Sequence, residues 1–386
     1  GVHDGAGQWP RRVVTGLQPT GELHVGNYFG AIRRAVRLQD QGEDLMIFVA
    51  DLHALTTHQD PRNLQERILD TTAALLASGV DPQRSVVFAQ SAVPRHAELG
   101  WLLTCLATQA RLAQLPQFRE RSAAGDARAG ELLYPVLQAA DVLLYRATHV
   151  PVGADQLQHL QLASQLVRTF HHRYGRAFPT PRPLLPDDAA LRLRSLRDPS
   201  RKMSKSDADP KSRILLTDSE EDVHLKIRKA VTDCTPQVTF EPEARPGVSN
   251  LVALHCLAAD KLPEEAVEEA AALTTAQYKR VVAAELARAL RPVRERALQL
   301  RARPDLLRDA QLRPLAHRRH QLAQQLHGLR RRLGLLLGRQ RAAHGRLGQQ
   351  LLGAQPARGR RARLVVGRVL RRRRGRPPVS PCGAAS

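Results

Sequence analysis

Short apolar runs alternate with segments of helical periodicity along the first half of the chain. Apolar runs of this length, bounded by turn residues, are typical of strands buried on both faces. We expect strands at residues 12–15, 45–50, 85–90 and 148–156, the last of which ends in a glycine turn. Helical spacing of apolar residues predicts helices at 28–39, 61–78, 96–115, 132–145 and 158–173. Strands that alternate with helices predict an α/β fold with a doubly wound parallel sheet.

The segments outside this alternation differ in character. Residues 117–130 indicate a mobile segment, and the proline-rich residues 179–188 indicate a linker or crossover loop. Helical periodicity resumes near Glu220 and continues in helices from residue 249 to 308. Residues 1–11 are expected to be frayed. No apolar run approaches the roughly 18 residues that a membrane span requires, so we expect no membrane segment.

The net charge of +22 is concentrated in one stretch. Residues 309–386 hold 19 arginines, no lysine and one acidic residue, Asp309, and so carry 18 of the 22 net charges. The remainder of the chain is nearly balanced. The excess positive charge therefore belongs to a single segment and does not characterise the rest of the protein.

Cysteine usage argues against a disulfide framework and against a cysteine metal site. The four cysteines are scattered and show no CxxC spacing, which favours a reducing compartment. No other cluster of metal-ligand residues is visible in the sequence. We expect no metal bound by protein ligands.

A strand, a glycine turn and a helix follow one another near the start of the chain. Residues 12–15 run into the turn 16–21, which is rich in Gly and Pro, and then into residues 24–27 and the predicted helix. Glycines let the backbone approach a ligand, and a helix N-terminus offers free N–H groups to an anion. The polar residues Asp51 and His53 follow the second strand, at the end where open α/β sheets bind ligands.

The five residues Lys202-Met203-Ser204-Lys205-Ser206 combine two ammonium groups and two hydroxyls. A loop of this kind can close over a polyphosphate, because lysines act as mobile point charges and hydroxyls supply short hydrogen bonds. On its own the run is more often a solvated linker. It becomes informative beside an upstream nucleotide-binding turn.

Three polar groups project from one side of the apolar helix predicted at 132–145. Tyr134, Gln138 and Asp141 stand at i, i+4 and i+7, and Pro135 suits a first helical turn. A carboxylate in so apolar a neighbourhood needs a partner. Asp141 either caps a neighbouring backbone or receives a hydrogen bond from a ligand, and the spacing leaves both open.

Residues 24–27 and 202–206, in this order and on this fold, resemble the two signatures of class I aminoacyl-tRNA synthetases. The match is closer to the tryptophanyl-tRNA synthetases of the bacterial and mitochondrial type. It extends over five further motifs, which are residues 16–21, 133–135 with 139–141, 150–153, 155–156 and 247–250. The resemblance runs from about Val13 to Asp309. It implies a Rossmann-like catalytic domain at 12–215 and a helical domain that binds tRNA and its anticodon at 216–309.

The resemblance also implies roles for individual residues. Asp141 would accept the indole N–H, and Tyr134 and Gln156 would hold the substrate ammonium. The other residues expected to line the tryptophan pocket are His53, Val14 and Gln138. The residues expected to contact ATP are Gln18, Thr20, His24, Gly26, Asn27, Asp155, Lys202, Met203, Ser204 and Lys205, together with Arg121, where many relatives carry lysine. The residues expected to be catalytic are Lys202, Lys205, Ser206 and Gln18, of which the first three would neutralise the β- and γ-phosphates.

The implied reaction has two steps: tryptophan is activated with ATP, and the acyl group then passes to tRNA(Trp). Mg²⁺ is expected to be held mainly by the ATP phosphates and water. The partners implied are L-tryptophan, tRNA(Trp) and a second copy of the chain, without a membrane. The implied compartment is the mitochondrial matrix, with a bacterial-type cytoplasm as the alternative.

Two other functions stay open. One is a tyrosine-specific relative, which differs in the amino acid that drives ATP–pyrophosphate exchange. The other is a non-catalytic RNA-binding protein that works through its basic tail. For residues 310–386, where the resemblance stops, we favour off-frame translation of a GC-rich gene over a genuine basic arm, and we expect a disordered or loosely helical tail.

Overall fold

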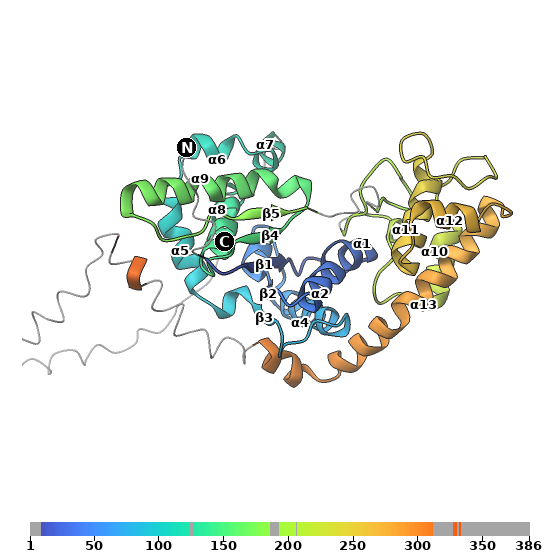
Figure 1. Ribbon diagram of the computed structural model, residues 1–386, viewed down its shortest axis with the longest axis horizontal. Helices are drawn as coiled ribbons and strands as arrows, with labels where there is room; N and C mark the ends of the chain where they lie inside the picture. The colour runs from blue at the N-terminus through green and yellow to red at the C-terminus, as the bar shows by residue number, and fades with distance from the viewer. Residues whose placement is uncertain are drawn as a thin grey trace, which may run out of the picture. The chain divides into compact units, whose positions relative to one another are not determined.

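The computed structural model describes residues 9–123, 125, 127–185, 193–205, 207–311, 327–329 and 332, and these form one five-stranded parallel sheet with helices around it (Figure 1). The strand order is β3-β2-β1-β4-β5. The strands are β1 Arg12–Leu17, β2 Asp44–Val49, β3 Val86–Ala89, β4 His149–Pro151 and β5 Arg182–Leu184. The chain builds outward from β1 to β3 and then returns to place β4 beside β1. The doubly wound, Rossmann-like α/β sheet is therefore confirmed, with its switch point between β1 and β4.

The helices that connect the strands follow the predicted periodicity closely. The first connection is α1 Val25–Asn27, a π-helical turn η1 at Tyr28–Ile32, and α2 Arg33–Asp40. The second is α4 Pro61–Ala77, whose N-terminus is capped by the Asp60 carboxylate and whose C-terminus is followed by Gly79 at φ +104°. The later helices are α8 Ala129–Leu143 and α9 Leu157–Tyr174.

Two segments differ from their predicted structure. The helix expected at 96–115 is two helices, α5 Arg95–Thr104 and α6 Gln109–Ala113, because Thr108 adopts an extended backbone (φ −99°, ψ 139°) between them. Neither glycine nor proline marks that break. The segment 117–130, expected to be mobile, contains the helix α7 Pro116–Ala123.

The positions of two prolines were also predicted wrongly. Pro135 lies inside α8 and not in its first turn, because the helix already begins at Ala129, where the Glu131 carboxylate accepts the Arg128 N–H. The proline-rich segment 179–188 contains a strand, β5, which pairs in parallel with β4. An edge strand tolerates proline, since only one of its sides joins a ladder.

Alternate residues of β1 and β2 pack into cores on opposite faces of the sheet, as a period of two requires. Val13 and Ile47 belong to one apolar cluster, and Val14 and Phe48 to the other. The cluster around Val14 is completed by α5, α8 and α9.

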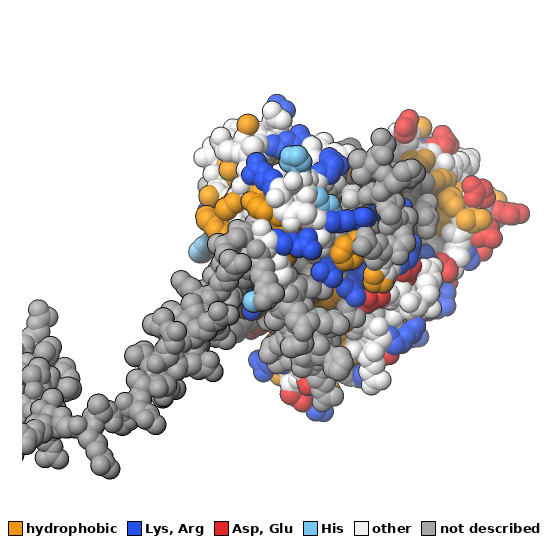
Figure 2. Space-filling view, turned by 60° about the vertical axis from the view of Figure 1, so that its left-hand side comes forward, with side chains coloured by type: hydrophobic (Ala, Val, Ile, Leu, Met, Phe, Trp, Pro, Cys, Tyr) orange, Lys and Arg blue, Asp and Glu red, His pale blue; other side chains and the backbone are white. Residues whose placement is uncertain are grey.

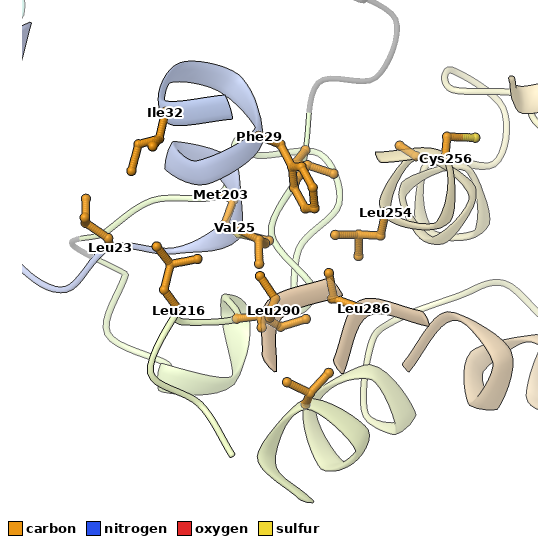
Figure 3. Packing of buried hydrophobic residues seen from close by; sticks show 14 of the residues in the cluster. Leu23, Val25, Phe29, Ile32, Met203, Leu216, Leu254, Cys256, Leu286 and Leu290 are labelled. Carbon is orange, nitrogen blue, oxygen red and sulfur yellow. The ribbon is translucent and has the colours of Figure 1, made fainter. Parts of the chain in front are cut away.

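The cluster on the other face continues into the second, helical part of the chain. That part consists of α10 Glu220–Arg228, α11 Pro246–Ala259, α12 Pro263–Glu269 and α13 Thr275–Arg301. Figure 3 shows Met203 close to Val25 and Leu23, with Leu286 and Leu290 of α13 and Leu254 of α11 nearby. The boundary expected at residues 215 and 216 therefore crosses a continuous hydrophobic core.

Among the described residues, no helix combines the length and the apolar composition needed to cross a bilayer. The predictions for residues 1–8 lie outside the described part of the chain. So do those for the basic tail, except at residues 310, 311, 327–329 and 332.

Candidate active site

The turn after β1 is shaped by close packing and by a short helix cap. A Cβ at Gly16 would stand 2.5 Å from the Phe48 ring, so this position requires glycine. Asn27 Oδ1 accepts the His24 N–H at 3.2 Å, and His24 Nδ1 accepts the Gly26 N–H at 3.1 Å. Because Nδ1 is an acceptor, the ring proton of neutral His24 lies on Nε2.

His24 is neutral at pH 7. Burial, and secondarily the charges of Lys205, Arg213 and Lys202, lower the pKa of His24 to about 4. Several cations therefore gather around this turn, although no acidic group balances them among the influences on His24. A neutral N–H donor among cations suits an anion.

The lysine loop lies against the same turn. Lys205 Nζ donates to the Gln18 carbonyl at 3.1 Å, and Lys205 Cβ lies 3.5 Å from the position of a Cβ at Gly21. Burial, and then the charge of Arg67, lower the pKa of Lys205 to about 8, so the group remains mostly a cation at pH 7. The predicted meeting of the two signatures is thus present in the structure, while Ser206 lies outside the described residues.

Met203 anchors this loop. Its side chain is 2% exposed and belongs to the apolar cluster shown in Figure 3. The segment that follows is tied to the first signature by backbone hydrogen bonds, from Val25 N–H to Ile214 O and from Leu216 N–H to Leu23 O. Any contact of Met203 with a nucleotide must therefore come from its backbone.

Asn250, from the motif at 247–250, holds the other side of the lysine loop. Its Oδ1 accepts the Arg194 N–H at 2.8 Å, and its Nδ2 donates to the Arg194 carbonyl at 3.0 Å. Arg194 in turn forms an antiparallel bridge with Lys202. Gly247 in the same motif is required because a Cβ there would stand 2.4 Å from the Val231 carbonyl.

We predict that Asn250→Ala slows formation of an adenylate by about tenfold while leaving amino-acid binding unchanged, because it frees the backbone beside Lys202 at a cost of about 1–2 kcal/mol. Single-turnover kinetics and ligand titration measure the two effects. The control is Ser249→Ala, whose hydroxyl accepts the Glu241 N–H instead. Equal kinetic losses in both variants would contradict a specific role for Asn250.

Asp141 is buried at the carboxyl edge of the sheet and is held by three side chains. Its exposure is 1%. Oδ1 accepts from Gln90 Nε2 at 2.7 Å and from His96 Nδ1 at 2.6 Å, and Oδ2 accepts from His53 Nε2 at 2.7 Å. Burial alone would raise the pKa of Asp141, but the charges and hydrogen bonds of His53 and His96 outweigh it and lower the pKa.

The count of lone pairs leaves Asp141 one acceptor site. Each carboxylate oxygen accepts about two hydrogen bonds, so Oδ1 is saturated and Oδ2 can accept one more. The neighbouring ring nitrogen of His53, Nδ1, is buried without a hydrogen-bond partner in the described part of the chain. The backbone-cap role that the sequence left open for Asp141 is not the one seen, because its three partners are side chains.

The residues that hold Asp141 were only partly predicted. His53 was expected in the pocket, but Gln90 and His96 were not, and Tyr145 O–H extends the network by a 2.7 Å hydrogen bond to His96 Nε2. Gln90 follows the buried strand β3, as His53 follows β2. Polar residues immediately after a buried strand were the signal that could have identified Gln90.

The other residues predicted to bind tryptophan lie around Asp141. Tyr134 contacts His53 edge-on at 4.4 Å between ring centroids, and its hydroxyl accepts from Gln18 Nε2 at 2.8 Å. Burial, and then the charge of Asp141, raise the pKa of Tyr134 to about 12, so the phenol stays protonated. Val14 is buried beneath the same region.

Gln138 and Gln156 meet at a histidine that the sequence did not single out. His159 Nδ1 lies 3.0 Å from Oε1 of each glutamine. Burial lowers the pKa of His159 to about 4. The charge of Asp155 acts to raise this pKa, and the charge of His53 acts to lower it further.

The remaining predicted ATP contacts are less enclosed. Lys202 and Asp155 are exposed, and Asp155 accepts from Gln156 Nε2 at 3.0 Å. Arg121 forms an ion pair with Glu131. Thr20 and Ser204 are half-buried beside the turn and in the lysine loop, respectively. Their roles toward ATP stay predictions.

Acid should destabilise this site. His24 and His159 have pKa values of about 4 when folded against 6.5 ordinarily, and the pKa of Asp141 is also lowered. The unfolded chain therefore binds more protons, and stability is lost as the pH falls from about 6.5 toward 4, by up to about 3 kcal/mol for each histidine. Urea unfolding at several pH values measures this loss. His24→Asn should flatten the pH dependence, and an unchanged slope would contradict the assignment.

Comparisons with known proteins identify the family. The family model described as tRNA synthetases class I (W and Y) matches residues 8–293. The chain is 43% identical to the tryptophan–tRNA ligase of Caulobacter vibrioides over 304 residues, covering 77% of this chain and 88% of that protein. It is 38% identical to the mitochondrial tryptophan–tRNA ligase of Schizosaccharomyces pombe over 322 residues, again covering 77% and 88%.

A solved structure gives the same answer. The tryptophanyl-tRNA synthetase of Campylobacter jejuni, complexed with ADP and tryptophan, superposes with a TM-score of 0.71 at 29% identity and covers 84% of this chain and 99% of that one. Sequence, sheet topology and the two assembled signatures point in one direction. The chain belongs to the class I tRNA synthetases for tryptophan and tyrosine, and within them to the tryptophanyl-tRNA synthetases.

Proposed function

We propose that this chain activates L-tryptophan with ATP and transfers it to tRNA(Trp). In the first step a carboxylate oxygen of tryptophan attacks the α-phosphorus, the bond to the β-phosphate oxygen breaks, and pyrophosphate leaves. In the second step a hydroxyl of the terminal ribose attacks the carbonyl carbon of the adenylate, and AMP leaves. The observation that carries the proposal is a buried carboxylate with one remaining acceptor site, beside a lysine loop docked on a glycine turn.

We assign tryptophan to the Asp141 side of the site. The indole N–H would donate to Asp141 Oδ2, and the ammonium would lie between Tyr134 and Gln156. A buried acceptor penalises analogues that lack the matching donor, since it then stays unpaired. His53, Val14 and Gln138 would line the ring.

We assign ATP to the side of the glycine turn. Lys202, Lys205 and Ser206 would approach the β- and γ-phosphates, with the neutral Nε2–H of His24 as a further donor, and Asp155 would contact the ribose. Positioning and charge neutralisation would supply most of the acceleration. Arg121 would reach the pyrophosphate only after leaving Glu131.

The surroundings fit a Mg²⁺ ion that arrives with the nucleotide. Within the described part of the chain, no group of three or more His, Cys, Asp or Glu side chains could hold a metal ion. The groups around His24 are cations, which suit phosphate oxygens better than a metal. When bound, Mg²⁺ would neutralise phosphate charge.

The helical part would bind tRNA, as membership of the family implies. Figure 2 shows Lys and Arg side chains gathered across the middle of one face of the molecule, with several Asp and Glu side chains at its right-hand edge. The basic middle of this face would add attraction for the phosphate backbone. We place the catalytic domain at residues 12–215 and the tRNA-binding domain at 216–309, and propose the mitochondrial matrix as the compartment, with a bacterial-type cytoplasm as the alternative.

The function is tested by two assays on one preparation of the full chain. Tryptophan-dependent ATP–pyrophosphate exchange tests the first step, and aminoacylation of tRNA(Trp) tests the second. Exchange driven equally by tyrosine, or none with tryptophan, would contradict the proposal.

We also propose a homodimer in which Trp101 is buried by the second copy. Trp101 lies on α5 and is 67% exposed in the single chain, although tryptophan is enriched at interfaces and rare on free surfaces. We predict that Trp101→Glu converts a dimer to a monomer in light scattering. Leu298→Glu, at a residue 59% exposed on α13, should leave the mass unchanged. A wild-type monomer at micromolar concentration would contradict the proposal.

A further inference from the structure

His159 is a buried histidine outside the motifs that carried the resemblance. It lies in the first turn of α9 and is 2% exposed. Its Nδ1 is 3.0 Å from Oε1 of Gln138 on α8 and 3.0 Å from Oε1 of Gln156, the residue that precedes α9. Its ring also lies 5.8 Å from the ring of Tyr134, measured between centroids. One side chain thus touches or borders three residues of the proposed tryptophan site.

The two partners determine where the ring proton lies. Both are amide oxygens and can only accept, so Nδ1 carries the proton and shares it between them. Since each carbonyl oxygen has two lone pairs, Gln156 Oε1 can still accept a second hydrogen bond. Gln156 Nε2 is already turned away and donates to Asp155 Oδ2. His159 therefore holds the amide oxygen of Gln156 on its own side, while Asp155 holds the amide nitrogen on the other.

We infer that His159 is a positioning residue for the substrate ammonium, which it serves by turning the oxygen of Gln156 inward and bracing Gln138. This inference rests on the proposed function. An ammonium needs acceptors, and a flipped amide would present N–H groups to it. A neutral imidazole performs this task without adding a charge of the same sign as the ligand.

The inference is tested by dissecting the ligand. Dissociation constants are measured by calorimetry on the full chain for L-tryptophan, for tryptamine, which keeps the ammonium, and for indole-3-propionate, which lacks it. His159→Ala should weaken L-tryptophan and tryptamine by about tenfold, the worth of one hydrogen bond, and indole-3-propionate by less than about twofold. His159→Asn, whose Nδ2 can replace the Nδ1–H, should restore most of the affinity. The KM for ATP should not change.

A matched control removes another buried histidine. His255 is 1% exposed and bonds to Tyr278 in the helical part, so His255→Leu should lower stability without changing any of the three dissociation constants. If His159→Ala does not fold, His159→Leu fills the volume without a donor and carries the same expectation. Equal weakening of all three ligands, or of none, would overturn the inference. Failure of the proposed function is recognised separately, by absence of tryptophan-dependent exchange in the wild type.

Discussion

The Asp141→Ala variant is expected to lose about 100-fold in kcat/KM for tryptophan, with little change for phenylalanine. The reason is that, in the proposed site, the buried carboxylate would offer its last acceptor site, on Oδ2, to the indole N–H, and a hydrogen bond to a buried charge is worth about 3 kcal/mol. Phenylalanine has no such donor. The ratio of the two kcat/KM values in pyrophosphate exchange measures the effect. If Asp141→Ala does not fold, Asp141→Asn keeps the shape and should change the ratio in the same direction.

Asp51 provides a matched control for the removal of a buried carboxylate. It is 4% exposed near the end of β2 and accepts from Ser91 Oγ, Ser91 N–H and Leu52 N–H. Asp51→Ala should lower the free energy of unfolding, as Asp141→Ala does, by about 3–5 kcal/mol. It should not change the choice between tryptophan and phenylalanine. Unchanged selectivity in Asp141→Ala would refute the assignment of the indole site.

The Lys205→Ala variant is expected to slow adenylate formation by about 10²–10³-fold while the dissociation constant for tryptophan changes by less than about twofold. Lys205 lies against the glycine turn, so in the proposed site its ammonium would stabilise charge that develops on the leaving pyrophosphate. Pre-steady-state kinetics separate this step from binding. Lys261→Ala, which removes a cation paired with Glu269 in the helical part, is the control. A large loss of tryptophan affinity would argue against the role of Lys205.

The pH dependence of the wild type gives a second view of Lys205. Its lowered pKa of about 8 means that the cation is lost as the pH rises through 8. The value of kcat/KM for ATP, which reports the free enzyme, should therefore fall above about pH 8. In the proposed ternary complex, nearby phosphates would raise the pKa of Lys205, so kcat should fall only at higher pH.

Local pattern predicted the sheet well, because buried strands and amphipathic helices leave periodic signals. The strands β1 to β3 were predicted from apolar runs, and α4 was predicted from the helical spacing of its apolar residues. β5 could not be predicted in this way, because its proline, Pro183, is acceptable only at a sheet edge, and edges are determined by tertiary pairing. The break between α5 and α6 likewise depends on the backbone of Thr108 and has no local signature.

The site residues that lie in sequence motifs could be predicted. The residues that join the site only through contacts between distant segments were not. Asp141, Tyr134 and His53 were expected in one pocket, and the structure joins them. Gln18 was expected on the ATP side, and its side chain donates to the Tyr134 hydroxyl. Gln90 and His159 were missed. Gln90 had a signal in its place directly after a buried strand, whereas a single histidine on a helix gives no local reason to choose His159. Met203 was expected to contact ATP; its side chain is buried in the core, so only its backbone could make that contact.

The most direct test compares tryptophan with β-(3-benzothienyl)alanine, in which sulfur replaces the indole N–H at nearly the same shape. Binding of both to the wild type and to Asp141→Ala is measured by calorimetry. If the buried Asp141 carboxylate accepts the indole N–H, the sulfur analogue should bind the wild type at least about 100-fold more weakly than tryptophan. Asp141→Ala should then remove most of this difference. Equal binding of the two ligands to the wild type would contradict the account.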